Sequence, residues 1–177
     1  MRFKIAVLLP LLLSQLTNAQ DAPQPKPGSL VYLDSRYGFR DLEFEQPIET
    51  CNGMALVEDD GDLKFYTRKE ESLELGGAKI KLIEYGFYKG KLANVTVNAE
   101  GKTNSVALLN YLKKYYGPGR KSPRGTEKYY WFGQKVLADY MAYSDGEKSS
   151  SGMWSKPMQA LGEADGKARP KKDAGGR

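Results

Sequence analysis

Four carboxylates crowd around one glycine in the segment EDDGD, residues 58–62. Carboxylate oxygens are the ligands that calcium prefers, so Asp59, Asp60 and Asp62 are candidate Ca²⁺ ligands. An EF-hand loop, however, spreads its ligands over about twelve residues and closes with a glutamate, whereas the segment after Asp62 already alternates like a strand. The alternative, which this pattern favours, is a solvated acidic turn in which Gly61 reverses the chain.

A basic loop is expected over residues 117–126, GPGRKSPRGT. Guanidinium groups bind phosphate and sulfate through paired hydrogen bonds, and clustered basic side chains also attract anionic lipid. Arg120 and Arg124 are therefore candidates for gripping a phosphate, a sulfated glycan or an anionic lipid surface. The alternative is an ordinary solvated loop, because Lys and Arg are usually exposed.

Four consecutive aromatic residues, 129–132, follow this loop. In a strand, alternation puts Tyr129 and Trp131 on one side and Tyr130 and Phe132 on the other. One pair must enter the core, and the other is expected near solvent, where aromatic platforms stack on sugars or bury partner side chains. The alternative is that both pairs are packed. Our candidate binding residues are Trp131, Tyr129, Arg120 and Arg124.

The chain contains no histidine and a single cysteine, Cys51. This excludes Ser-His-Asp and Cys-His catalysis and leaves no zinc or copper site of the usual kind. Glu84 and Asp139 stand out as carboxylates in apolar segments, but an acid with a raised pKa needs a buried site. We therefore expect no enzymatic activity, no metal and no cofactor. Cys51 is predicted to be a small buried apolar group rather than a bridging thiol.

The first 19 residues have the pattern of a cleavable secretory signal. Arg2 and Lys4 precede the apolar run IAVLLPLLL, and Thr17 and Ala19 are the small residues before a predicted cut at Gln20. The apolar run is about half the ~20 residues that a transmembrane helix needs. The sequence thus predicts export to the periplasm or the medium, with no transmembrane segment in the mature chain.

The formal net charge of +5 is misleading. Two of these charges leave with the predicted signal, and the segment after Gly162 carries an excess of two more, so the domain between them is close to neutral. Nucleic-acid binders show a concentrated basic footprint within the fold. No nucleic-acid partner is expected.

The rest of the chain predicts one α+β domain over residues 29–156, between a Pro-rich linker (20–28) and a disordered basic tail (157–177). Alternating segments predict an antiparallel sheet of about five to seven strands, two of them starting the domain over residues 29–34 and 37–44. Gly76-Gly77 predicts a hairpin. A change of phase within residues 78–88 predicts a β-bulge.

One long helix is expected over residues 103–116, packed on one face of the sheet. Val106, Leu109 and Leu112 form an apolar stripe at helical spacing. Thr103 or Asn104 is the expected N-cap, and Gly117-Pro118 ends the helix.

Four segments carry a resemblance: EYGFYKGKL (84–92), YYGPG (115–119), EKYYWFG (127–133) and VEDDGDLKFYTRK (57–69). Together they resemble a group of small, exported, uncharacterised bacterial proteins. The resemblance implies an α+β envelope or secreted protein and implies no activity. The cysteine and the long basic tail are not part of the pattern.

The leading hypothesis is an exported, non-enzymatic binding domain whose partner is an envelope or extracellular protein or an anionic glycan. One alternative is a carboxylate enzyme acting on envelope or extracellular glycans, which needs two acids about 5–10 Å apart. Another is docking to anionic lipid or glycan through the basic loop and tail.

Overall fold

The computed structural model describes residues 25–123, 127–143 and 146–168. The predicted signal peptide, Arg124 and residues 169–177 lie outside the described residues. The helices are α1 (Leu30–Arg36), α2 (Lys102–Tyr116), α3 (Lys156–Ala168) and the 3-10 turn η1 (Ile48–Thr50). The strands are β1 (Gly38–Phe39), β2 (Leu42–Glu43), β3 (Met54–Asp60), β4 (Leu63–Arg68), β5 (Glu74–Leu75), β6 (Ala78–Tyr88), β7 (Lys91–Glu100), β8 (Arg120–Lys121), β9 (Lys128–Phe132), β10 (Val136–Ala142) and β11 (Lys148–Ser155).

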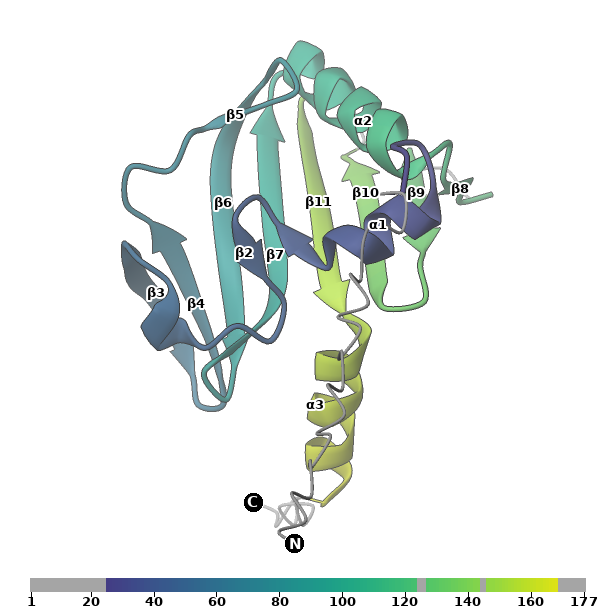
Figure 1. Cartoon of the computed structure of the whole chain (residues 1–177). Coiled ribbons are helices and arrows are strands. Elements are labelled where there is room, and N and C mark those ends of the chain that lie inside the picture. The colour runs from purple at the N-terminus through teal and green to yellow at the C-terminus, as the bar shows by residue number, and fades with distance from the viewer. Residues whose placement is uncertain (1–24, 124–126, 144–145, 169–177) are drawn as a thin grey trace, which may run out of the picture.

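A 9-stranded antiparallel sheet dominates the fold, in the order β3-β4-β6-β7-β11-β10-β9-β8, with β5 beside β6 (Figure 1). Helix α2 carries the chain from β7, in the middle of the sheet, to the β8 edge, and β9 and β10 lead back to β11 beside β7. The sheet is larger than the five to seven strands predicted. The strands that were not predicted are β3, whose acidic end looked like a turn, and the two-residue β8, which pairs with β9 at two positions.

Helix α2 confirms the predicted long helix, and Gly117, at φ 90°, ends it. Leu108, Leu109 and Leu112 are buried against the sheet, but Val106 is 47% exposed, so its place in the predicted stripe was wrong. The predicted N-cap residues were also wrong, since the N-cap of α2 is Gly101. The Asn104 side chain instead donates to the Glu100 carbonyl and accepts the Lys79 N–H.

Helix α1 occupies residues for which the sequence predicted a strand. The Ser29 side chain caps it by accepting the Tyr32 N–H at 3.1 Å, which satisfies a backbone donor that a helix start leaves open. Leu33 enters the core, and Tyr32 stacks on Tyr115 of α2 with the ring centroids 5.9 Å apart. Packing against α2 thus selects the helix. The predicted strand over residues 37–44 is the small β1–β2 hairpin.

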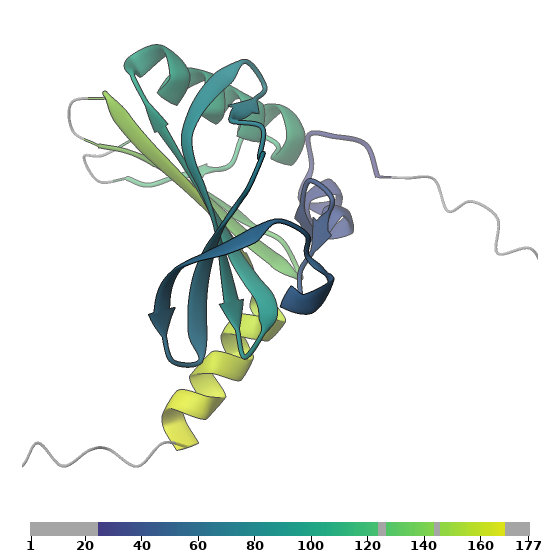
Figure 2. The ribbon, with the colours of Figure 1, turned by 90° about the vertical axis from the view of Figure 1, so that its left-hand side faces the viewer.

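Helix α3 corrects the prediction of a disordered tail after Pro157, as far as Ala168. Met158 is buried at its start. Near its end, Asp165 accepts the Tyr88 hydroxyl at 2.7 Å and pairs with Lys89 at 2.6 Å, so the turn between β6 and β7 holds it. Figure 2 shows α3 leaving the lower end of the twisted sheet.

Two local predictions are confirmed. Gly76 and Gly77 both have positive φ and join β5 to β6 in a hairpin, as two-residue turns of this kind require. The register of β6 against β7 shifts between Ile80 and Leu82, which is the predicted bulge. The expected burial of Cys51 is also confirmed.

Helices α1 and α2 lie on the same face of the sheet (Figure 1), and their buried side chains join those of the strands in one core. The other face, which we call the open face, carries the alternate residues of each strand. Helix α3 reaches this face at Tyr88, whose hydroxyl donates to Asp165. This arrangement decides which member of each alternating pair reaches solvent.

None of the helices in the described residues is long and apolar enough to cross a membrane.

Candidate functional site

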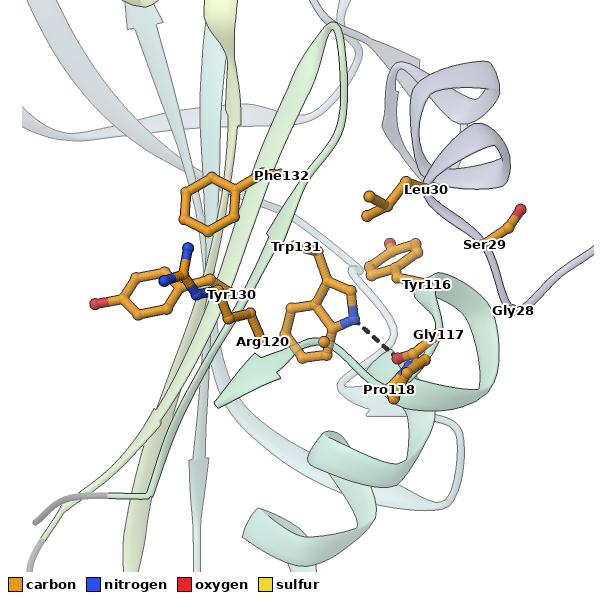
Figure 3. Close-up of a pocket in the computed structure, with 11 residues that line it drawn as sticks. Gly28, Ser29, Leu30, Tyr116, Gly117, Pro118, Arg120, Tyr130, Trp131 and Phe132 are labelled. Carbon is orange, nitrogen blue, oxygen red and sulfur yellow. Dashed lines mark hydrogen bonds between the residues drawn. The ribbon is translucent and has the colours of Figure 1, made fainter. Parts of the chain in front are cut away.

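A groove of about 370 Å³ lies at the β9 end of the sheet (Figure 3). Three segments that are distant in sequence line it: residues 28–30 at the start of α1, residues 116–120 from the end of α2 into β8, and residues 130–132 of β9. We call it the edge groove. Most of its lining is apolar, and Leu30 on one wall is 41% exposed.

Trp131 forms the floor of the edge groove. Its side chain is 1% exposed, and its Nε1–H donates to the Gly117 carbonyl at 2.9 Å (Figure 3). Tyr116 meets the indole edge-on, with centroids 6.3 Å apart. Gly119 passes so close that a Cβ there would lie 2.8 Å from the indole, and its φ of 71° also favours glycine. The end of α2 is therefore built around Trp131.

The alternation of the four aromatic residues is as predicted, and the structure now assigns the faces. Trp131 and Tyr129, at 1% and 9% exposed, belong to the core, so neither is an exposed binding residue as the sequence analysis proposed. Tyr130 and Phe132 lie on the open face, stacked with centroids 5.6 Å apart. Phe132 is 49% exposed. Core packing under α2 takes the first pair and leaves the second at the surface.

The edge of β9 is open beside Phe132. Strand β8 pairs with β9 at Arg120↔Tyr130 and Lys121↔Tyr129, and in the described residues β8 begins at Arg120. On the other side of β9, the Gly133 N–H donates to Val136 at the start of β10. Because successive peptide groups point to opposite edges of a strand, the N–H and C=O of Phe132 point away from β10. They face the end of the edge groove that β8 does not cover.

The α1 wall is fixed to the β9–β10 turn by Asp34. Its carboxylate accepts three backbone N–H groups, from Gln134 at 2.6 Å, Lys135 at 2.8 Å and Val136 at 2.9 Å. Gly133 leaves room for this contact, since a Cβ there would lie 2.3 Å from Asp34 Oδ1. One side chain of α1 thus positions Leu30 opposite β9.

We expect Asp34→Ala to lower the free energy of unfolding by about 1.5–3 kcal/mol, the range for hydrogen bonds to charged groups. Chemical denaturation measures this. Ser35→Ala is the control, because the Ser35 hydroxyl bonds only the Tyr32 carbonyl of its own helix. It should change stability by less than about 0.5 kcal/mol. Equal effects of the two substitutions would mean that Asp34 does not anchor α1.

The rim of the edge groove carries one basic side chain, the exposed Arg120. Further along β9, the Lys128 ammonium lies over the Tyr130 ring at 5.1 Å from its centroid and pairs with Asp139 at 3.9 Å. Cations over aromatic faces are held by the ring quadrupole. The predicted neighbourhood of aromatic rings and basic side chains therefore exists, with Tyr130 and Phe132 in place of the buried pair.

Glu84 and Asp139 both lie on the open face. Burial raises the pKa of each carboxyl above its usual range, and nearby Glu58 adds to the rise at Glu84. Glu84 pairs with Thr96 and Thr96 with Gly152, whose N–H donates to Asp139 at 3.0 Å. The two acids are therefore three strand intervals apart, about 14 Å at ~4.8 Å per interval. Glycosidase pairs are about 5–10 Å apart, so Glu84 and Asp139 do not form such a pair.

We expect Asp139→Asn to stabilise the protein at neutral pH. A carboxyl whose pKa is raised by folding contributes stability at low pH and loses it as pH rises through the folded pKa. Asparagine keeps an acceptor for the Gly152 N–H without the charge. We would measure the free energy of unfolding at about pH 3 and pH 7. The stability of the variant relative to the parent chain should increase as the pH rises above ~4.

We expect Asp41→Asn to have the opposite effect on stability at neutral pH. The Arg68 guanidinium, at 2.7 and 2.8 Å, holds the pKa of the Asp41 carboxyl below its usual range. That stability exists above the unfolded pKa and is lost as pH falls, so this variant should lose stability at neutral pH relative to the parent chain. Parallel pH profiles for the two variants would contradict both assignments.

The acidic segment reverses the chain at Gly61 and is largely exposed, as predicted. The turn is shorter than predicted, because Asp59 and Asp60 lie in β3 and Gly61 and Asp62 form the turn. Asp59 pairs with Lys64 at 2.7 Å and accepts the Gly61 N–H at 3.1 Å. Within the described residues, no three His, Cys, Asp or Glu side chains are arranged to hold a metal ion.

A second polar cluster ties the β1–β2 hairpin to the connection after β4. Glu71 is nearly buried, pairs with Arg40, and accepts the Tyr85 hydroxyl at 2.7 Å. Burial, and then the Glu71 bond, raise the pKa of the Tyr85 hydroxyl. These groups satisfy one another, so the cluster is structural, whereas the edge groove exposes apolar groups that lack such partners.

The α1 side of the edge groove was not predicted from the sequence, because Leu30 was expected to lie in a strand. The one available signal was Ser29, which is a preferred N-cap residue.

Comparisons with family models, curated proteins and solved structures found no match to this chain.

Proposed function

We propose that this chain is an exported, non-enzymatic binding domain that holds a segment of a partner protein in the edge groove. The observation that carries the proposal is the groove itself: a mainly apolar hollow at an open strand edge, flanked by the exposed Phe132 ring, the half-buried Tyr130 ring and Arg120. Exposed apolar surface bordered by polar groups is typical of interaction sites.

The composition of the edge groove supports a protein partner. Aromatic residues and arginine are enriched in protein interfaces and among the residues that dominate binding energy. Leu30 and Phe132 are both about half exposed, on opposite sides of the groove. A protein segment would bury both. A glycan needs polar groups for its hydroxyls, and the mainly apolar lining favours a peptide over a sugar.

The proposal of export rests on residues 1–19, and the proposal of a non-enzymatic role rests on the lack of histidine and the single cysteine. The resemblance to small exported bacterial proteins agrees with both.

The test uses the mature chain, residues 20–177, immobilised and exposed to envelope and extracellular extracts of its host. We expect a specific protein to be retained by the parent chain and by Leu56→Ala, and lost from the Leu30→Ser/Phe132→Ser double variant. Leu56 is a matched control, because it is 54% exposed but lies on the opposite edge strand, β3.

Retention of the same proteins by the double variant would contradict the proposal. Loss from the double variant of material that a glycosidase, but not a protease, removes from the parent chain would assign the groove to a glycan instead.

A further inference from the structure

The two edges of the sheet differ in how they are protected from pairing. Edge strand β3 carries a bulge between Leu56 and Glu58 and ends in the acids Asp59 and Asp60. Bulges and charges are devices that keep an edge from accepting another strand. Beside Phe132, in the described residues, the β9 edge has neither a bulge nor a charged side chain of its own strand. The unprotected edge is the one beside the edge groove.

Strand β8 cannot close this edge. Extending the register from Arg120↔Tyr130 would place Pro118 opposite Phe132. Proline has no N–H to donate, and the chain from Gly117 to Gly119 turns away into α2, held by the bond from Trp131 to the Gly117 carbonyl. The position of the missing strand is the edge groove.

We propose that the edge groove binds its partner by strand addition: an extended acidic segment of another protein continues the line of β8 and pairs with the Phe132 backbone. This inference rests on the proposed function and names the form of the segment. An extended segment added to a sheet edge gains main-chain hydrogen bonds, while pockets read alternate side chains. Here Leu30, Tyr116 and the Trp131 floor would receive the side chains on one face.

The other face and the charge define the rest of the segment. Side chains on the opposite face of the added strand would lie beside the exposed Phe132 ring. The basic residue in the lining of the groove is Arg120, which is exposed and pairs with Tyr130, so an acidic segment is favoured.

Two segments of this chain outside the described residues do not fit as the occupant. Residues 20–24, QDAPQ, contain no large apolar side chain, and residues 169–177, RPKKDAGGR, are basic and contain none either. The proposed occupant is a segment of another protein.

The probe is a short fluorescent peptide of alternating valine and glutamate. Three comparison peptides are used. One carries lysine in place of glutamate, one is methylated at the backbone nitrogen of every valine, and one is methylated at the backbone nitrogen of every glutamate. Because alternate amides point to opposite edges of a strand, strand addition predicts that one methylated form loses binding and the other keeps it. We expect fluorescence anisotropy to show a loss of at least about tenfold, or ~1.4 kcal/mol, for that form and for the lysine peptide.

The protein side of the test uses Phe132. Phe132→Leu keeps the backbone N–H and an apolar side chain. Phe132→Pro removes the backbone N–H, which makes no hydrogen bond to β10, and an edge strand tolerates proline at such a position. We expect the proline variant alone to lose the acidic peptide. Hydrogen exchange of the Phe132 amide can be measured in the parent chain, so this test does not depend on the folding of a variant. We expect bound peptide to slow this exchange.

Equal binding of both methylated peptides, or an unchanged Phe132 exchange rate in the peptide complex, would overturn strand addition and leave the proposed function standing. Failure of the acidic peptide to bind the parent chain would also overturn the inference, and the capture experiment then decides the proposed function separately.

Discussion

Trp131→Ala is expected to lower the free energy of unfolding by about 3–5 kcal/mol, the range for truncating a buried large aromatic side chain. The indole is 1% exposed, contacts Tyr116, and donates to the Gly117 carbonyl at 2.9 Å. Truncation removes this packing and leaves the carbonyl at the end of α2 without its donor. Denaturant unfolding followed by circular dichroism measures the loss.

The neighbouring residue is the control. Phe132→Ala, on the open face and 49% exposed, should change the free energy of unfolding by less than about 0.5 kcal/mol. The same substitution should weaken partner binding. Adjacent residues would thus divide stability and binding between them. A small effect at Trp131 together with a large one at Phe132 would mean that the two faces of β9 are assigned the wrong way round.

Leu112→Ala is the second large effect, with an expected loss of about 2–5 kcal/mol. Leu112 is 1% exposed on the face of α2 that packs on the sheet. The alanine itself favours the helix, so the loss reports packing rather than helix propensity. The same unfolding measurement applies.

Val106→Ala tests the opposite side of the same helix. Val106 is 47% exposed, and alanine has the higher helix propensity, so this variant should be as stable as the parent chain or slightly more so. A loss at Val106 similar to that at Leu112 would restore the apolar stripe that the sequence predicted and contradict the orientation of α2 in the structure.

These pairs of variants are designed to separate residues that stabilise the fold from residues that are proposed to bind the partner. Trp131 and Asp34 hold the floor and the α1 wall of the edge groove. Phe132 and Arg120 stand at its rim and make no comparable contribution to the core. Binding can therefore be altered at the rim while the fold stays intact, which makes the proposals separable from stability.

Local patterns in the sequence were sufficient where an element is long or where one residue type decides the geometry. Helix α2 was found from its spacing and its terminating Gly117, and the Gly76-Gly77 hairpin and the β6 bulge were found from glycine chemistry and alternation. Short or atypical elements were not. The seven residues of α1 fit a strand equally well, and the acidic end of β3 looked like a turn until β4 paired with it.

For the site, the sequence by itself determined that Tyr129 and Trp131 share one face of a strand and that Tyr130 and Phe132 share the other, because side chains alternate along any strand. Only the tertiary structure decided that the first pair is buried and the second exposed, since this depends on which face α1 and α2 cover. The tertiary structure also creates the edge groove, because its walls come from three segments that are far apart in the chain. Alternation is a property of neighbouring residues, whereas burial and grooves arise when distant segments meet, and no local pattern encodes that meeting.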